Sequence, residues 1–321
     1  MRILVTGGAG FIGSHLSEEL IRLGHQVKVI DNLSTGRRSN LDTLLDNPHF
    51  EFHEGSILDH DLLHQCISDV DFVFHLAAAV GVFNIVKHPL DSLLTNIRGT
   101  ENVLEAAHAS STPVLVTSSS EVYGKNISDS LKESDDRILG SPVTLRWSYS
   151  EAKAIDESLA YAYYVEKKLE TRIARFFNTV GPRQLGAYGM VVPRFVKSAL
   201  ANEAITIYGD GKQTRCFAHV YDVIDAVLAI AFSNNTIGKV INIGNNFEIS
   251  INDLAKKIIS ETNSNSKIVY VPYEEAYGDG FEDMERRVPN IELINQLVGW
   301  KPQRDLTTMI SDIAAEMNKT L

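Results

Sequence analysis

The strongest constraint on the fold is an alternation of strand-like and helix-like segments that begins at the N-terminus. The apolar run Arg2–Thr6 predicts a strand, and apolar residues within 11–23 recur with the 3.6-residue period of a helix. Further strands are predicted at residues 26–30, 50–52, 70–76, 113–117, 171–176 and 240–244, and further helices at residues 89–109, 148–168 and 220–232. This alternation predicts an α/β fold, in which helices cover both faces of a parallel sheet.

The second half of the chain is less regular than the first. Glycine and proline interrupt it often after Asn178, although the segment 240–244 still has the character of a core strand. We therefore expect a Rossmann doubly wound parallel sheet with a smaller C-terminal substrate-binding lobe, and a chain that crosses between them more than once. Residues 1–178 and 219–248 are assigned to the Rossmann lobe, and residues 179–218 and 249–321 to the second lobe.

Composition excludes several classes of protein. The 321 residues are 44% hydrophobic and 22% charged, as in ordinary soluble globular proteins. The N-terminus has no signal-peptide pattern, and no apolar run approaches a membrane span, so we expect a cytoplasmic protein without a membrane partner. Cys66 and Cys216 show no metal-like spacing, and no metal site is expected. The net charge of −11 argues against a nucleic-acid partner.

Three glycines between the first strand and the first helix predict a dinucleotide site. Gly7, Gly10 and Gly13 allow a tight turn and let the backbone approach a pyrophosphate at the helix N-terminus. Asp31 ends the second strand, where a carboxylate would bond the adenosine ribose hydroxyls and repel a 2′-phosphate. The sequence therefore favours NAD over NADP, although the arginine pair at 37–38 leaves that choice open.

A tyrosine and a lysine on one helix predict oxidation chemistry. Tyr149 and Lys153 are four residues apart and share a helix face, and Ser119 follows the fifth predicted strand. A tyrosine alone is a poor base, but a neighbouring ammonium and an oxidised nicotinamide both favour the phenolate. Tyr149 would then take a proton from an alcohol while the alcohol carbon gives a hydride to NAD⁺.

Seven motifs along the chain resemble those of the extended short-chain dehydrogenase/reductases, the family of nucleotide-sugar epimerases, dehydratases and decarboxylases. In chain order they are TGGAGFIGSH, DNLSTG, HLAA, SSSEVYG, YSEAK, RFFNTVGPR and YGDGKQTRCFAHV. The resemblance covers nearly the whole chain. It implies a tightly held NAD, oxidation of the sugar C4 hydroxyl, chemistry at the activated sugar, and return of the hydride.

The resemblance also implies which residues form each site. The catalytic residues would be Tyr149, Lys153, Ser119, Ser120 and Glu121. The cofactor would contact Gly7, Gly10, Phe11, Ile12, Gly13, Asp31, Asn32, Ser34, Gly36, Ser56, Ile57, Leu76, Ala77, Ala78, Asn96, Thr117, Tyr149, Lys153 and Phe176. The nucleotide sugar would contact Asn178, Arg183, Val192, Tyr208, Arg215 and Arg287.

The acid at position 121 narrows the reaction. 4-Epimerases usually carry a small hydroxyl residue there, and 4,6-dehydratases carry Asp-Glu, with the Asp protonating the departing hydroxyl. Here Ser120 precedes Glu121, so the acid for dehydration is absent. The sequence is most similar to the UDP-glucuronate decarboxylases, with further matches at residues 146–149, 213–217, 277–278 and 281–283.

Decarboxylation is the favoured reaction on chemical grounds. A C4 ketone makes the C5 carboxylate of glucuronate a β-keto acid, and carbon dioxide leaves as electrons flow into an enolate. Glu121 could repel the substrate carboxylate or position a water, and Arg215 could anchor the carboxylate or reprotonate C5. UDP-xylose is the expected product, although release of the keto-pentose stays open.

Three other functions remain open from the sequence. The chief alternative is a UDP-sugar 4-epimerase, acting on UDP-glucose or UDP-glucuronate, and a dehydratase is a more distant one. A dinucleotide-binding sensor without turnover would not explain why Ser119, Tyr149, Lys153, Asn178 and Arg183 occur together. By resemblance, the helices at 89–109 and 148–168 would also form a four-helix homodimer interface.

Overall fold

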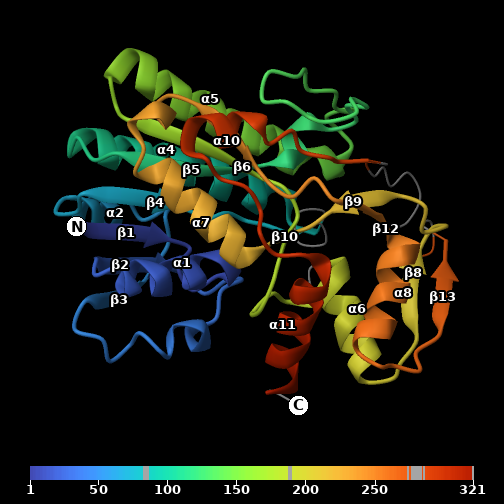
Figure 1. The fold of residues 1–321 in the computed structure, drawn as a ribbon. Helices are drawn as coiled ribbons and strands as arrows, with labels where there is room; N and C mark the ends of the chain where they lie inside the picture. The colour runs from blue at the N-terminus through green and yellow to red at the C-terminus, as the bar shows by residue number, and fades with distance from the viewer. Residues whose placement is uncertain (82–86, 187–189, 273–274, 276–283, 285, 320–321) are drawn as a thin grey trace.

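The computed structural model describes residues 1–81, 87–186, 190–272, 275, 284 and 286–319. Seven parallel strands form a central sheet in the order β11-β6-β5-β4-β1-β2-β3, with helices on both faces (Figure 1). The strands are β1 (Arg2–Thr6), β2 (Gln26–Asp31), β3 (Phe50–Glu54), β4 (Phe72–His75), β5 (Val114–Ser119), β6 (Thr171–Phe176) and β11 (Val240–Ile243). The predicted α/β fold with a doubly wound parallel sheet is therefore confirmed.

Two hydrophobic cores hold the helices against this sheet. Alternate strand residues point to opposite faces, so Ile3 and Val5 enter one core and Leu4 enters the other. The helices of the first core are α1 (Phe11–Arg22), α7 (Val220–Ala231) and α10 (Glu292–Val298), and those of the second are α2 (His60–Ile67), α4 (Pro89–Ala109) and α5 (Ser148–Lys167). Both faces of the sheet are buried, which explains why its strands are almost continuously apolar.

The second lobe has its own hydrophobic core, on the right of Figure 1. Its helices are α6 (Val191–Leu200), α8 (Ile251–Glu261) and α11 (Leu306–Asn318). Its strands form two pairs, parallel β8 (Ile205–Tyr208) with β13 (Ile268–Val271) and antiparallel β9 (Thr214–Cys216) with β12 (Glu248–Ser250). A short parallel pair, β7 (Thr179–Val180) with β10 (Ala218–His219), lies where the chain leaves and re-enters the first lobe.

One segment lies outside the lobe predicted for it. Ile294 of α10 and Trp300 belong to the core beside the sheet, although the predicted division assigns residues 249–321 to the second lobe. The Trp300 indole N–H donates to the carbonyl oxygen of Asp222 in α7 at 3.0 Å, which fixes this contact. The rest of the division stays a prediction.

The register of the sheet brings the carboxyl ends of five strands (β1, β2, β4, β5 and β6) to the same edge, across which the strands end. Thr6 pairs with Ile30 and with His75, and Ser119 pairs with Phe176. Three short helices follow near this edge, η1 (Arg38–Leu41), η2 (Ser120–Tyr123) and η3 (Leu145–Trp147). Loops at this edge are where ligands bind in doubly wound sheets.

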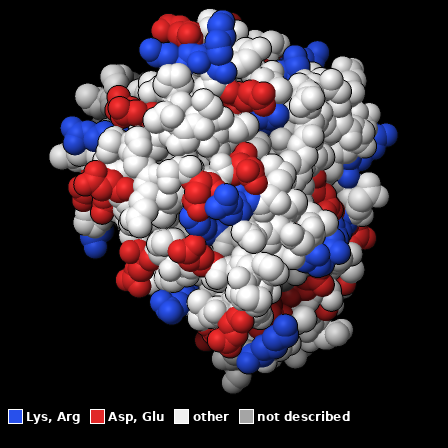
Figure 2. Space-filling model, turned by 90° about the vertical axis from the view of Figure 1, so that its left-hand side faces the viewer, with Lys and Arg blue, Asp and Glu red and all other residues white. Residues whose placement is uncertain are grey.

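The surface and helices show two further features. Acidic and basic side chains lie interspersed on the face shown in Figure 2, without a large region of one sign among its described residues. None of the described helices is both long and apolar enough to cross a bilayer.

Candidate active site

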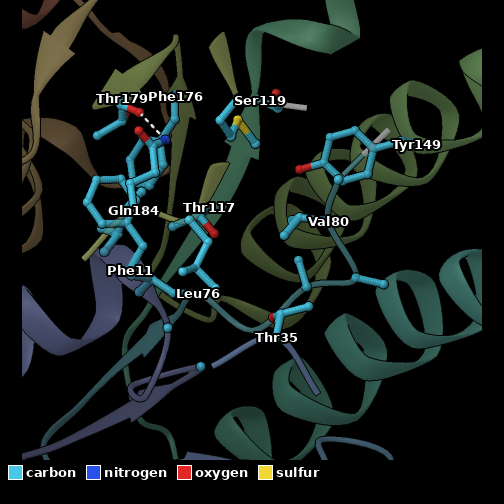
Figure 3. A pocket seen from close by; sticks show the side chains of 18 of the residues that line it. Phe11, Thr35, Leu76, Val80, Thr117, Ser119, Tyr149, Phe176, Thr179 and Gln184 are labelled. Atoms are coloured by element: carbon cyan, nitrogen blue, oxygen red, sulfur yellow. Dashed lines mark hydrogen bonds between the residues drawn. The ribbon is translucent and has the colours of Figure 1, made fainter. Parts of the chain in front are cut away.

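A cavity of about 820 Å³ lies at the carboxyl ends of the sheet strands and extends between the two lobes. All five predicted catalytic residues line it, together with most of the predicted cofactor and substrate residues. Figure 3 shows Tyr149 pointing into the cavity from α5, with Ser119 nearby at the end of β5 and Phe11, Leu76 and Thr117 at its floor. The sheet edge and the second lobe therefore meet at one site.

The glycine loop is tightly packed and leaves the start of α1 open. Gly7 has φ +71°, and a Cβ there would lie 2.7 Å from the backbone nitrogen of Ala77. A Cβ on Gly13 would lie 2.2 Å from the carbonyl oxygen of Gly7, so both positions require glycine. Gly10 precedes α1, which has no side-chain cap, so its first backbone N–H groups can bind an anion in the cavity.

Asp31 lies beside this loop at the end of β2. Its carboxylate accepts the backbone N–H of Ala9 at 2.9 Å and that of Leu33 at 2.8 Å. Burial raises the pKa of Asp31, while these two hydrogen bonds oppose the shift. Two hydrogen bonds leave acceptor capacity on the carboxylate for ribose hydroxyls. Arg37 also lines the cavity, whereas Arg38 lies over the Phe52 ring at 5.3 Å.

The predicted oxidation trio is assembled at the ends of β5 and α5. Tyr149 and Ser119 both line the cavity, and Lys153 Nζ donates to the carbonyl oxygen of Thr117 at 3.1 Å. Burial raises the pKa of Tyr149 above its ordinary value, Lys153 opposes this, and the negative charges of Glu121 and Asp156 add to it. As the sequence predicts, Lys153 acts to lower this pKa. Without a bound cofactor the pKa is nevertheless raised, because burial and the two carboxylates outweigh the ammonium.

Glu121 is held between two arginines. Its Oε1 lies 2.5 Å from Arg287 Nη1, and its Oε2 lies 2.6 Å from Arg146 Nη1. All three side chains are nearly buried, with 14%, 9% and 7% exposure for Glu121, Arg287 and Arg146. Burial alone would raise the pKa of Glu121, but the two guanidinium groups lower it to about 2. Glu121 is thus a permanent anion in this site.

The predicted substrate residues form part of the cavity wall. Arg287 Nη2 donates to Asn178 Oδ1 at 3.3 Å, and Asn178 in turn donates to the Cys216 carbonyl oxygen at 3.0 Å. Arg215 is 7% exposed and donates to the Thr214 carbonyl oxygen at 2.8 Å. Val192 and Tyr208 line the same wall. This wall brings two nearly buried arginines, Arg215 and Arg287, to the cavity.

Arg183 is already paired within the protein. It lines the cavity, but its guanidinium donates to Ser14 at 3.2 Å and to Glu18 at 2.7 Å, both on α1. Its φ of +68° shows that the loop after β7 makes an unusual turn at this residue. Arg183 therefore fastens this loop to α1, and a ligand phosphate would meet a guanidinium that Glu18 already neutralises.

Three predicted cofactor residues do not line the cavity. Gly36 packs beneath Ala9 and Asp31, and the Ser56 hydroxyl accepts the backbone N–H of Leu58 at 3.1 Å. Asn96 is buried and bonds both backbone groups of Ala79, at 2.7 and 3.2 Å. These residues support the loops of the site, while Ile57, next to Ser56, lines the cavity itself.

Arg286 and Arg287 have different roles although they are adjacent. Arg286 donates two hydrogen bonds to Glu248, at 2.7 and 2.9 Å, and lies away from the cavity, whereas Arg287 lines it. The expectation that one of the two faces the site is met by Arg287. Two of the predicted family matches lie outside the described residues, at 277–278 and 281–283. Residues 187–189 also lie outside them.

Sequence reasoning missed Arg146 as a functional residue. It was noted only as part of a family motif, although it binds one of the two carboxylate oxygens of Glu121. Its position directly before the helix that carries Tyr149 is a signal that could have revealed it. His75, by contrast, is a buried structural group: it bridges the hydroxyls of Thr6 and Thr100 at 2.8 and 3.1 Å, and burial lowers its pKa to about 3.

Comparisons with known proteins agree with this geometry. Residues 4–313 match the family described as GDP-mannose 4,6 dehydratase. The chain is 41% identical to a UDP-N-acetyl-alpha-D-glucosaminuronate decarboxylase of Bacillus cytotoxicus, over 94% of this chain and 92% of the relative. It is 37% identical to UDP-glucuronic acid decarboxylase 1 of Danio rerio, over 94% of this chain and 69% of that one. The solved UDP-glucuronic acid 4-epimerase of Bacillus cereus, in complex with UDP-glucuronic acid and NAD, covers all of both chains with a TM-score of 0.89 at 29% identity.

Proposed function

The chain belongs to the GDP-mannose 4,6-dehydratase family of extended short-chain dehydrogenase/reductases, and on that premise we propose that it is an NAD-dependent decarboxylase of UDP-glucuronate. The observation that carries the proposal is the anionic Glu121 held by Arg146 and Arg287 next to the oxidation trio. Ser120 occupies the position where a dehydratase would need an acid. The relatives with decarboxylase names support the same choice.

The residues present fit NAD. The uncapped start of α1 suits the pyrophosphate, and the Asp31 carboxylate suits the ribose hydroxyls and disfavours a 2′-phosphate. The other lining residues that would hold the cofactor are Gly7, Gly10, Phe11, Ile12, Gly13, Asn32, Ser34, Ile57, Leu76, Ala77, Ala78, Thr117 and Phe176. When bound, NAD⁺ supplies a hydride acceptor for the sugar C4 and a positive charge that favours the phenolate of Tyr149.

Tyr149, Ser119 and Lys153 would carry out the oxidation. The Tyr149 oxygen takes the proton from the C4 hydroxyl, Ser119 hydrogen-bonds the same substrate oxygen, and Lys153 stabilises the resulting phenolate. Both side chains line the same cavity, so one bound sugar could reach both hydroxyls. The same residues would return the proton when the hydride is given back.

Glu121 would act on the substrate carboxylate through the two arginines that it binds. With a pKa of about 2 and an arginine on each oxygen, it neither gives nor takes a proton near neutral pH. Together with Arg146 and Arg287 it forms a group with one net positive charge, which attracts the uronate carboxylate and fixes the directions of the two guanidinium groups. Arg215 and Arg287 are nearly buried cations that line the cavity, and they would hold the substrate carboxylate and stabilise the developing enolate.

Mass spectrometry of the product from UDP-glucuronate and NAD⁺ tests the proposal. Loss of carbon dioxide is the expected result, and the product mass then distinguishes UDP-xylose from the keto-pentose. An isomer of unchanged mass would instead establish a 4-epimerase, the activity named for the Bacillus cereus structure. UDP-N-acetylglucosaminuronate is the second substrate to test because the Bacillus cytotoxicus relative is named for it.

The proposal also includes a homodimer formed by α4 and α5, in the cytoplasm. Leu90 on α4 is 65% exposed, and Ile155, Tyr161 and Val165 on α5 are 41%, 52% and 45% exposed. Burying such side chains against a second copy would stabilise a dimer. The thiols of Cys66 and Cys216 are free, as a reducing compartment would leave them. Light scattering of the wild type and of Ile155→Arg tests the interface, because the arginine should shift a dimer to monomer.

A further inference from the structure

A buried carboxylate lies directly against Lys153, and the proposed chemistry gives it no role. Asp156 follows Lys153 by three positions on α5, so both side chains share one helix face. Lys153 Nζ donates to Asp156 Oδ2 at 3.0 Å, and to the carbonyl oxygen of Thr117 at 3.1 Å. The Asp156 side chain has no exposed surface, and that of Lys153 is 3% exposed. Water therefore screens this ion pair very little.

The ionisable groups around the pair come from three elements. They are Tyr149, Lys153, Asp156 and Glu157 on α5, Glu121 on η2 and His75 on β4. The helix α4 contributes the Thr100 hydroxyl, which hydrogen-bonds His75 Nε2 at 3.1 Å.

Most of these neighbouring groups are either uncharged or have their charge balanced by an arginine. His75 is neutral, the charge of Glu121 is matched by its two arginines, and Glu157 is paired with Arg175 at 2.6 and 2.7 Å. Asp156 is therefore the carboxylate that acts most directly on Lys153.

This pairing weakens the effect of Lys153 on Tyr149. Burial alone would lower the pKa of Lys153, but Asp156 and Tyr149 raise it above its ordinary value. The ammonium thus keeps its proton, yet its positive charge is largely offset by a carboxylate at 3.0 Å. Burial is the largest cause of the raised pKa of Tyr149; Lys153 opposes it, and Glu121 and Asp156 add to it.

We propose that Asp156 is a positioning residue for the oxidation step: by pairing with Lys153, it keeps the Tyr149 hydroxyl protonated until oxidised cofactor is bound. The inference rests on the proposed role of Tyr149 as the base. Without Asp156, the uncompensated ammonium would favour the phenolate and lower the pH at which it forms in the cofactor-free enzyme. With Asp156 in place, the positive charge that favours the phenolate has to come from the oxidised nicotinamide. Formation of the base is then linked to the oxidation state of the cofactor.

The test is the titration of Tyr149 in the cofactor-free protein, followed by the ultraviolet absorbance of tyrosinate. Subtracting the titration of Tyr149→Phe isolates this residue from the other tyrosines. Asp156→Asn should move the midpoint down by about one pH unit, since Asp156 is a nearly unscreened negative charge that raises the pKa of Tyr149. The pH at which the rate of nicotinamide reduction by UDP-glucuronate rises should move in the same direction. The absorbance titration and this rate both report the first proton lost by the Tyr149–Lys153 pair.

Thr100→Val is the matched control. It removes the buried hydrogen bond between Thr100 and His75, beside the ion pair, but keeps the charge of Asp156, so it should lower stability without moving the titration. If Asp156→Asn does not fold, Lys153→Met and the double variant Lys153→Met/Asp156→Asn provide the comparison. The double variant buries no unpaired charge, and its Tyr149 should titrate at lower pH than in Lys153→Met.

An unchanged midpoint in Asp156→Asn, or an equal midpoint in the two Lys153 variants, would overturn the inference. The titration needs neither cofactor nor sugar nucleotide. A wild-type enzyme that leaves UDP-glucuronate unchanged would therefore count against the proposed function alone, and an unmoved midpoint against the role of Asp156 alone.

Discussion

Replacing Glu121 with glutamine should destabilise the protein strongly, and the loss should depend on pH. A pKa lowered from 4.5 to about 2 corresponds to about 3 kcal/mol of native-state stabilisation at neutral pH. The native state prefers the ionised form, so this stabilisation is fully present above about pH 4.5 and is lost as the pH falls through about 2. The free energy of unfolding should thus fall by about 3 kcal/mol at pH 7 and by only about 1.4 kcal/mol near pH 3.

The physical cause is the pair of arginines left behind. Arg146 and Arg287 are 7% and 9% exposed, and removing the charge between them leaves two nearly buried cations uncompensated. Urea unfolding at the two pH values measures the effect. Glu248→Gln is the matched control, because Glu248 also binds an arginine with two hydrogen bonds but at a more exposed position, and should cost less than about 1 kcal/mol.

The same variant separates the two halves of the proposed reaction. Glu121→Gln keeps Tyr149, Lys153 and Ser119, so reduction of NAD⁺ by UDP-glucuronate should persist while release of carbon dioxide slows by about 100-fold. A loss below about 1 kcal/mol at pH 7, or an equal loss at both pH values, would refute the electrostatic reasoning. Undiminished release of carbon dioxide would refute the proposed role of Glu121 in the reaction.

Three more substitutions test other parts of the site. Tyr149→Phe should slow C4 oxidation by about 100-fold or more and change the unfolding free energy by about 1 kcal/mol at most, as measured by nicotinamide absorbance and urea unfolding. Gly7→Ala should abolish the NAD content of the purified protein, because the new methyl group meets the Ala77 backbone at 2.7 Å. The control Gly24→Ala, at φ +84° in open space, should keep the cofactor and lower the free energy of unfolding by about 1 kcal/mol. Equal NAD content in the two variants would contradict the steric argument. Glu157→Gln should cost about 3 kcal/mol in urea unfolding because it breaks a buried bidentate pair with Arg175, and a loss below about 1 kcal/mol would show that the pair is better solvated than its burial indicates.

The sequence predicted the features that depend on local pattern. The segments at residues 2–6, 89–109 and 171–176 match β1, α4 and β6, because their apolar spacing reports directly which side chains face a core. Glu121 could also be singled out, because the motif SSSEVYG places it where the reactions of the resembling family differ in their side chains. Asp156 carried a readable signal as well, because a spacing of three residues on a helix places it on the face of Lys153.

The partners of these residues could not be predicted in the same way. Arg287 lies 166 residues after Glu121, and only the packing of the two lobes brings their side chains within 2.5 Å. The pairing of Arg183 with Glu18 spans 165 residues for the same reason. A charge pattern in sequence does not encode such contacts, so the raised pKa of Tyr149 and the lowered pKa of Glu121 emerge only from the folded arrangement.

The place of β11 at the edge of the sheet has a consequence for how the chain is made. Its partner β6 ends at Phe176, and the ribosome synthesises β7 to β10, α6 and α7 before Val240 emerges. Until then β6 presents unpaired backbone groups along one side, which is the kind of surface that captures other strands. The two lobes therefore mature as one unit, and a fragment ending at residue 178 would carry the nucleotide loops on an open, aggregation-prone sheet.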